Sequence, residues 1–309
     1  MANRDSPAVA RIFDRRTVRR RRDRTASRFP EYDFLFREVA DRLADRLADI
    51  TRSFATAIEL GSRNGIVRRA VAGLGRIDRL VEADLSAAMV ADGGLAVVAD
   101  EECLPFAPAA ADLVLSNLSL HWVNDLPGTL VQIRRILRPD GLFLAAMLGG
   151  DTLRELRRAL IEAEEATSGG AAPRVSPFAG LADAAALLQR AGFALPVADT
   201  DTITVTYADA LSLMRDLRGM GETNAILARP GGFTRRTTLL EATARYVELY
   251  ADEQGRIPAT FQILYLAGWA PHESQQRPLA PGSADKRLAD ALGTQERSAG
   301  ETAGGRRKG

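Results

Sequence analysis

The chain has 309 residues, of which 46% are hydrophobic and 26% are charged, a composition that excludes a disordered or fibrous protein. Its net charge of +1 divides unevenly: residues 1–28 carry ten arginines against three aspartates, a balance of +7, and the remainder carries −6. A single cysteine, Cys103, excludes an intramolecular disulfide and a metal centre made of cysteines. The sequence also shows no apolar stretch of membrane-spanning length and no apolar core of a secretory signal.

Residues 1–30 are predicted to form a basic N-terminal helical arm. Its arginines suit docking to a partner protein, peripheral contact with an anionic membrane surface or, together with Tyr32, covering a cleft of the following domain. A solvated arm is the alternative. Nucleic acid is not expected as a partner, because no aromatic side chains interleave with these arginines to stack on bases.

Residues 31–269 are predicted to form one α/β domain. An amphipathic helix over 31–49 comes first, with Leu35, Val39, Leu43 and Leu47 at helical spacing. Strand-length apolar runs then alternate with helical stretches, the strands at 56–60, 80–83, 96–99, 113–116 and 142–148 and the helices at 64–72, 86–90 and 126–137. This order favours a mostly parallel, doubly wound sheet with helices on both faces and a ligand beyond the carboxyl ends of the strands.

The second half of the domain begins with a helix over 152–166, where Thr152 and Glu155 have the spacing of a capping box. A helix over 182–191 and a strand over 195–207 follow. A helical insertion at about 208–255 then precedes the last strand, 258–269. We expect residues 270–309 to form a C-terminal tail that is largely disordered after about 285.

Polar residues follow four of the predicted strands at the point where each strand ends. The first strand runs into Glu59-Leu60-Gly61-Ser62-Arg63-Asn64-Gly65, Asp84 ends the second, Asp100-Glu101 follows the third, and Asn117-Leu118 ends the fourth. Any one of these is more often an ordinary turn or a solvated acid. Because the ends of parallel strands meet at one edge of a sheet, the four together favour an adenosine pocket. The turn does not match the dinucleotide fingerprint Gly-x-Gly-x-x-Gly.

These strand ends resemble the S-adenosylmethionine site of class I methyltransferases, and the wider sequence is similar to the mitochondrial complex I assembly factor 5 family and its bacterial relatives. The similarity extends from about residue 12 to 285. The segments that carry it are 97–106, 119–127, 149–153, 199–201, 219–224, 258–260 and 268–275. The resemblance implies a Rossmann-like methyltransferase fold with a seven-stranded sheet and S-adenosylmethionine as the cofactor.

Residue by residue, the resemblance implies that Glu59, Gly61 and Gly65 form the first cofactor motif. Asp84 with Leu85 would bind the ribose, Asp100 with Glu101 the adenine, and Asn117 with Leu118 would flank the methionine part. Arg63 departs from the family pattern, because methyltransferases usually have the central glycine of the motif here. Either Arg63 pairs with the methionine carboxylate, or it obstructs the cofactor site.

His121 and Trp122 follow the fourth strand and are the candidate catalytic or substrate-facing pair, since histidine can exchange a proton near neutral pH. A packed aromatic cluster is the equal alternative. Cys103 is expected to be a small buried residue and not a nucleophile. No metal site is predicted, because the two histidines, His121 and His272, lie far apart in the sequence.

The family resemblance implies an enzyme that modifies a protein arginine, by methylation or hydroxylation, during assembly of respiratory complex I. Its partner would be a complex I subunit. The expected location is the bacterial cytoplasm, with peripheral contact to the inner membrane through the arm, or the mitochondrial matrix in a eukaryote. Two alternatives stay open: a small-molecule or malonyl-carrier methyltransferase, and an assembly chaperone with a vestigial cofactor site.

Overall fold

The computed structural model describes residues 11–90, 94–276, 290 and 293–295. The chain divides into two units, Met1–His272 and Glu273–Gly309, and all the helices and strands named below belong to the first. Most of the predicted disorder after residue 285 falls outside the described residues. No helix in the described part of the chain is both long enough and apolar enough to cross a membrane.

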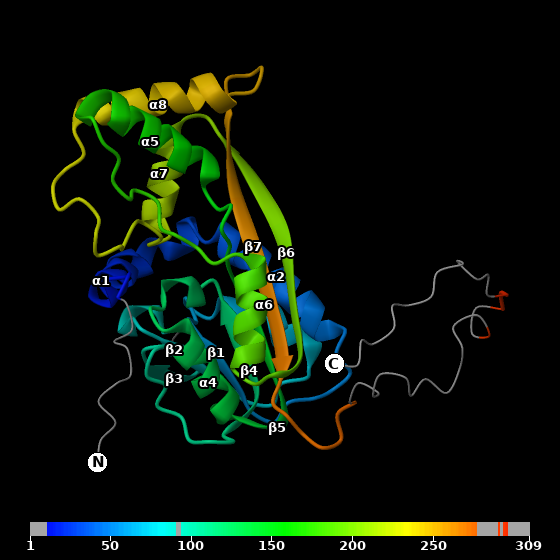
Figure 1. Ribbon diagram of the computed structural model, residues 1–309. Helices are drawn as coiled ribbons and strands as arrows, with labels where there is room; N and C mark the ends of the chain where they lie inside the picture. The colour runs from blue at the N-terminus through cyan, green and yellow to red at the C-terminus, as the bar shows by residue number, and fades with distance from the viewer. Residues whose placement is uncertain (1–10, 91–93, 277–289, 291–292, 296–309) are drawn as a thin grey trace, which may run out of the picture. The chain divides into compact units, whose positions relative to one another are not determined.

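A seven-stranded sheet forms the centre of the first unit (Figure 1). Its strands are β1 (Ala57–Leu60), β2 (Leu80–Asp84), β3 (Leu95–Val98), β4 (Ala111–Asn117), β5 (Leu137–Leu148), β6 (Ala194–Tyr207) and β7 (Ile257–Trp269). The spatial order is β3-β2-β1-β4-β5-β7-β6. Strands β1 to β5 run parallel, and β7 is antiparallel to both of its neighbours. The predicted doubly wound sheet is confirmed.

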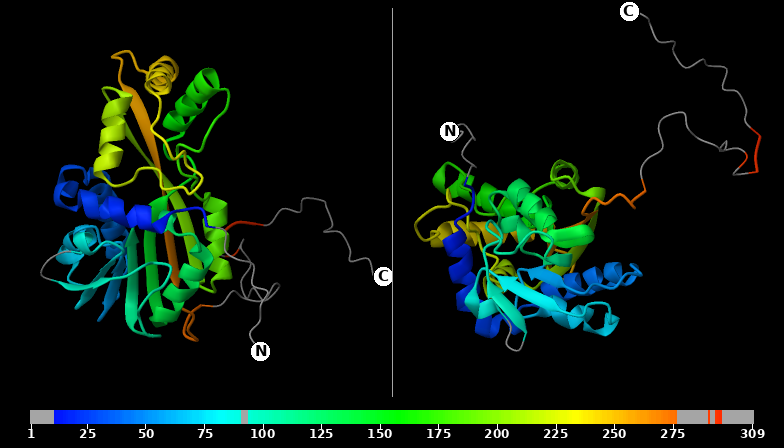
Figure 2. Two further views of the ribbon diagram at one scale, coloured as in Figure 1. Left: turned by 90° about the vertical axis from the view of Figure 1, so that its left-hand side faces the viewer. Right: turned by 90° about the horizontal axis from the view of Figure 1, so that it is seen from below.

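Helices cover both faces of the sheet (Figure 2). Helices α2 (Phe34–Ala48) and α3 (Ile66–Val71) lie over one face, and α4 (Leu126–Ile136) and α6 (Leu181–Arg190) lie over the other. Successive side chains of β4 point to opposite faces of the sheet, so this strand contributes to the apolar core on each face. Leu113 and Leu115 pack with α2, and Val114 packs with α4. The central strands β1, β4 and β5 are mostly buried on both faces for this reason, and their short apolar runs made them recognisable in the sequence.

A second helical layer lies at one end of the sheet. It consists of α5 (Arg154–Ser168), α7 (Ala210–Gly219) and α8 (Arg236–Tyr250), the last two being the predicted insertion between β6 and β7. Figure 1 shows the long antiparallel strands β6 and β7 rising together from the sheet to this layer, and this pair, which is joined through the insertion, is called the β6–β7 hairpin below. The hairpin pairs from Ala194 opposite Trp269 to Tyr207 opposite Ile257, so it connects the two parts of the unit.

The basic segment forms helix α1 (Arg15–Thr25) and a 3₁₀ helix, η1 (Ala26–Glu31). Asp14 caps α1 by accepting from the Thr17 amide. Val18 and Arg22 are buried on one face of the helix, whereas Arg19 and Arg20 are exposed on the other. Beside α1, Phe13 forms a β-bridge with Ile226 of the insertion. In the described residues the arm is therefore a packed element with an exposed basic face.

Three local predictions are wrong. Thr152 and Glu155 do not form a capping box: α5 begins at Arg154, the Thr152 hydroxyl donates to the Gln262 carbonyl, and the Glu155 carboxylate accepts from Thr260. These partners lie on β7, more than a hundred residues away, and compete successfully with the local cap. The predicted helix over 86–90 is a single 3₁₀ turn, η3 (Ala87–Met89). Cys103 is exposed, because it lies in a turn that follows β3.

Candidate functional site

The turn between β1 and α3 brings the backbone close to the end of β4. Gly61 has φ +79°, and a Cβ atom there would lie 2.4 Å from the Cβ atom of Ser119, so only glycine fits. Arg63, Asn64 and Gly65 are also left-handed, with φ of +45°, +60° and +70°. The predicted first motif is thus a tight turn, and Arg63 occupies a backbone conformation that favours glycine.

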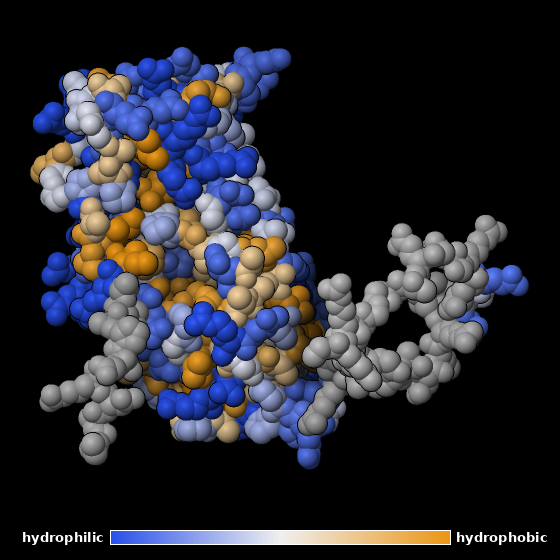
Figure 3. All heavy atoms as spheres, viewed as in Figure 1, coloured by the Kyte–Doolittle hydropathy of each residue, from blue (hydrophilic) through white to orange (hydrophobic). Residues whose placement is uncertain are grey.

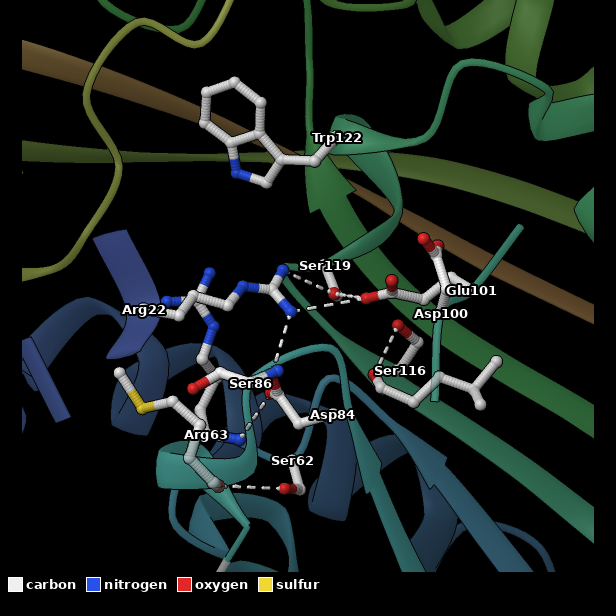
Figure 4. A network of polar contacts seen from close by, with 12 residues as sticks. Arg22, Ser62, Arg63, Asp84, Ser86, Asp100, Glu101, Ser116, Ser119 and Trp122 are labelled. Carbon is white, nitrogen blue, oxygen red and sulfur yellow. Dashed lines mark hydrogen bonds and ion pairs between the residues drawn. The ribbon is translucent and has the colours of Figure 1, made fainter. Parts of the chain in front are cut away.

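The carboxylates predicted at the ends of β2 and β3 lie together, and an arginine of α1 joins them (Figure 4). Arg22 Nη1 lies 3.2 Å from Asp84 Oδ1 and 3.4 Å from Glu101 Oε1, and its Nη2 donates to Ser119 Oγ at 2.9 Å. All four side chains are buried. Arg15 donates to Asp100 and also to Glu101. Helix α1 therefore covers the strand ends and neutralises their charge.

The electrostatics of this cluster favour the ionised forms. Burial raises the pKa of Glu101, but Arg15 and Arg22 outweigh it and hold that pKa well below its usual range. Burial lowers the pKa of Arg22, and Asp84 and Glu101 more than compensate, so the guanidinium stays charged. Sequence reasoning placed the acids correctly at one edge of the sheet. It missed Arg15 and Arg22, whose places in a run of arginines gave no signal of burial.

Glu59 lies within the sheet and not at its rim. It is fully buried in β1 opposite Glu82 of β2. Neither of its carboxylate oxygens has a hydrogen-bond partner among the described residues. Burial, together with Glu82 and Asp84, raises the pKa of Glu59 well above its usual value. A buried carboxyl group without a hydrogen-bond partner is uncommon in proteins and suits a ligand that can exchange hydrogen bonds with it.

Asn117 and Leu118 lie at the end of β4, on the side of helix α2. Asn117 donates to the carbonyl of Phe36 at 2.8 Å, and its buried Oδ1 has no partner among the described residues. Leu118 has φ +47°. Leu85 is buried in a small cluster with Phe13, Val18 and Trp122. Asp84 and Leu85 therefore contact the segment of residues 13–22, and Asn117 contacts helix α2.

A cavity of about 310 Å³ lies between the ends of β4 and β5 and the second helical layer. Its wall is mostly apolar, and Figure 3 shows apolar side chains gathered on this face between the upper helices and the sheet. Leu118 and Leu148 at the strand ends, Leu156 of α5 and Leu217 of α7 belong to this wall. His121, Trp122 and Glu222 form a polar part of it. The two candidate catalytic residues thus line one cavity.

Glu222, just after α7, binds both of them. Its Oε2 lies 3.0 Å from His121 Nε2 and accepts from Trp122 Nε1 at 2.7 Å, and its Oε1 accepts from Arg63. Burial raises the pKa of Glu222, but Arg63 and His121 dominate and lower it to about 2. Burial lowers the pKa of His121, which favours the neutral ring. Trp122 also packs edge-on against Phe13, so the pair is both packed and exposed to the cavity.

Whether Arg63 pairs with the methionine carboxylate or obstructs the cofactor site stays a prediction. Its side chain leaves the turn toward the insertion, where the guanidinium donates to Glu222 and to the Met220 carbonyl, 3.0 Å away. The guanidinium carbon also lies 4.8 Å from the centre of the Phe36 ring. Burial and nearby Arg22 lower the pKa of Arg63. Glu222 itself was missed as a site residue, although it lies within one of the segments that carried the resemblance.

The sheet order and the strand-end site define a Rossmann-like methyltransferase fold. A family model described as "Methyltransferase domain" matches residues 58–145. Among solved structures, the YcgJ protein from Bacillus subtilis superposes with a TM-score of 0.52 at 12% identity, covering 75% of this chain and 99% of that one. Phosphoethanolamine N-methyltransferase 2 from Haemonchus contortus, in complex with S-adenosyl-L-methionine, superposes with a TM-score of 0.50 at 15% identity, covering 82% of this chain and 60% of that one.

The chain belongs to the family of the curated proteins named arginine-hydroxylase NDUFAF5, mitochondrial. It is 44% identical to the protein from Danio rerio over 90% of this chain and 89% of the relative. It is 45% identical to the human protein over 90% of this chain and 83% of the relative. Malonyl-[acyl-carrier protein] O-methyltransferase from Halorhodospira halophila is 34% identical, covering 88% of this chain and 93% of the relative.

Proposed function

We propose that the protein is an S-adenosylmethionine-dependent enzyme that modifies an arginine of a protein substrate, a subunit of respiratory complex I. The observation that carries the proposal is the juxtaposition of two sites. Buried acids at the ends of adjacent parallel strands lie next to a cavity, and residues 117–122 contribute to both. The higher identity to arginine hydroxylases than to carrier methyltransferases supports arginine as the target.

The strand-end residues offer the hydrogen-bonding groups that S-adenosylmethionine requires. Asp84 and Glu101 are acceptors suited to ribose hydroxyls and an adenine amine, Gly61 keeps the turn open, and the unpartnered oxygens of Glu59 and Asn117 can accept further hydrogen bonds. When bound, this cofactor supplies a methyl group on a positively charged sulfur. Arg22 donates to the same carboxylates that the ribose and the adenine would need, so we expect its guanidinium to move when the cofactor binds.

His121 is the residue best placed to take a proton. The ionised Glu222 carboxylate fixes the ring with hydrogen on Nε2, which leaves Nδ1 as an acceptor, and Nδ1 has no partner among the described residues. A guanidinium nitrogen that gains a methyl group from the sulfonium gives up a proton. The lowered pKa of His121 keeps the ring neutral at pH 7 and available for that proton.

Calorimetric titration tests the cofactor site. The wild-type chain and Asp41→Ala, which alters an exposed acid of α2, are expected to bind S-adenosylmethionine. Asp84→Ala is expected to lose most of that binding, because it removes the acceptor for the ribose. Absence of binding by the wild-type protein at millimolar ligand would refute the assignment.

Mass spectrometry of complex I subunits tests the reaction. We expect a gain of one methyl group or one oxygen atom on an arginine, lost in cells that carry Asp84→Ala. A methyl ester on an acyl carrier would instead favour the carrier-type enzyme. Complex I that assembles normally with the Asp84→Ala chain would favour a chaperone role and contradict an enzymatic one.

A further inference from the structure

The guanidinium of Arg63 is held by groups that together make a guanidinium-binding site. The Glu222 carboxylate and the Met220 carbonyl accept its hydrogen bonds, and the ring of Phe36 lies 4.8 Å from its central carbon. A carboxylate with an aromatic face is the usual way in which proteins bind an arginine side chain. The chain thus contains this site already filled by one of its own arginines.

The same three groups can also be reached from the cavity. Phe36, Met220 and Glu222 line it, and Glu222 is the single acidic residue in the wall formed by the described residues. Its Oε1 accepts one hydrogen bond from Arg63 and has capacity for a second. The leucine-rich wall around it suits the methylene stem of a long side chain, because such stems pack on apolar surface while the charged end is paired.

The rim of the cavity carries the opposite charge. Arg174 and Arg229 line it and pair with Glu164 and Asp14. Arg21 and Arg218 also line it, and neither has a carboxylate within ion-pair distance in the described part of the chain. Burial lowers the pKa of Arg21, and the nearby Arg229 adds to that effect. Two cations without a carboxylate partner favour a ligand with acidic groups outside the cavity.

We propose that Glu222 receives the guanidinium of the substrate arginine, and that the substrate is an acidic segment whose flanking carboxylates bind Arg21 and Arg218. The proposal rests on the proposed function and assigns its specificity to one carboxylate and two rim arginines. Glu222 binds the substrate guanidinium on Oε1, beside Arg63 or in its place. His121, on the other oxygen of Glu222, then lies next to the bound guanidinium.

Peptide binding without cofactor tests the proposal independently of the reaction. The probe is a capped peptide, Gly-Asp-Gly-Arg-Gly-Asp-Gly, compared with versions that carry citrulline for arginine or lysine for both aspartates. We expect the wild-type chain to bind the first peptide and each altered peptide at least about tenfold more weakly, the loss typical of one charged hydrogen-bonded pair. Equal binding of the citrulline peptide, or no binding of the arginine peptide, overturns the proposal.

Two variants locate the contact. Glu222→Gln removes the charge with little change of shape and is expected to weaken binding of the arginine peptide by at least about tenfold. The control, Glu155→Gln, alters a buried carboxylate that accepts a hydrogen bond from Thr260 and does not line the cavity. The affinity of this variant for the arginine peptide should match that of the wild type. If Glu222→Gln binds the arginine peptide as tightly as the wild type does, the proposal is wrong, whatever the outcome of cofactor titration.

A second measurement avoids substitution in case Glu222→Gln does not fold. N-propylguanidinium, N-propylammonium and propionate are titrated separately into the wild-type chain, and the indole N–H resonance of Trp122, which donates to Glu222, is followed by NMR. The indole of Trp269 is the internal reference. We expect N-propylguanidinium to shift the Trp122 resonance at the lowest concentration. A shift by propionate at a lower concentration would overturn the proposal.

Discussion

Glu222 is a single carboxylate shared by donors from the β1–α3 turn and from the segment after β4. Its partners Arg63, His121 and Trp122 are 100 to 159 residues away in the sequence. No spacing rule relates residues so far apart, so the pairing could not be predicted. Asp84 and Glu101 could be, because each follows a recognisable strand and parallel strands end at one edge.

The lowered pKa of Glu222 predicts a specific acid sensitivity. A carboxyl group whose pKa falls from 4.5 to about 2 on folding contributes stability above pH 4.5, and that stability is lost as pH falls toward 2. Between pH 5.5 and 3 the loss from this group is about 2 kcal/mol in the free energy of unfolding.

Urea unfolding of the wild type and of Glu222→Gln across this pH range measures the contribution. The variant should be less stable at pH 5.5 and should lose less stability on acidification than the wild type. His121 adds a loss of its own, because its lowered pKa costs stability as pH falls below 6.5. Parallel pH profiles for the two chains would contradict the assignment.

At the scale of the element, helix α1 packs against the domain with one face and exposes basic side chains on the other, and its composition alone does not distinguish the two faces. Its run of arginines suggests one solvated basic surface, yet Arg15, Val18 and Arg22 follow each other at intervals of three or four residues on the inward face, and Ala26 of η1 continues this spacing. Helical periodicity is normally detected from apolar residues, and here two of the four inward residues are arginines. The central strands β1 and β4, by contrast, are buried on both faces, and the strands were located within a few residues.

Arg22 gives a prediction for this helix. Arg22→Met removes a cation from a fully buried pair with Asp84 and Glu101, so we expect the free energy of unfolding to fall by about 3–5 kcal/mol. The same change frees the acceptors proposed for the ribose and the adenine. S-adenosylmethionine should therefore raise the melting temperature of the variant by more than it raises that of the wild type.

Arg24→Met, on the exposed face of the same helix, is the control. It should change neither the free energy of unfolding nor the rise in melting temperature that S-adenosylmethionine causes. A smaller thermal shift by the cofactor in Arg22→Met than in the wild type would indicate that Arg22 helps to hold the cofactor and does not compete with it.

At the scale of the molecule, the β6–β7 hairpin makes the sheet and the second helical layer one structure. Phe261 and Ile263 of β7 pack in the same apolar core as Leu35 of α2 and Tyr246 of α8. We expect residues 11–272 to unfold in one transition, because neither part keeps its core without the hairpin. Tryptophan fluorescence and far-UV circular dichroism should give coincident urea midpoints.

Phe261→Ala probes this coupling. Truncating a ring that is 1% exposed should lower both midpoints together, with a loss of about 3–5 kcal/mol. If the two urea midpoints still coincide in the variant, residues 11–272 unfold as a single cooperative unit. Separation of the two transitions, with the fluorescence change first, would show that the layer around the cavity can open while the sheet stays folded.

The position of β7 also bears on how the chain is made. Among the described residues this strand is the last along the chain but lies between β5 and β6, and β6 has no other neighbour there. Until residue 269 has left the ribosome, the nascent chain exposes one open edge on β5 and a fourteen-residue β6 without a partner. Synthesis therefore reaches its most aggregation-prone point late, during translation of the helical insertion, and this is the interval in which a chaperone that binds extended segments would be needed.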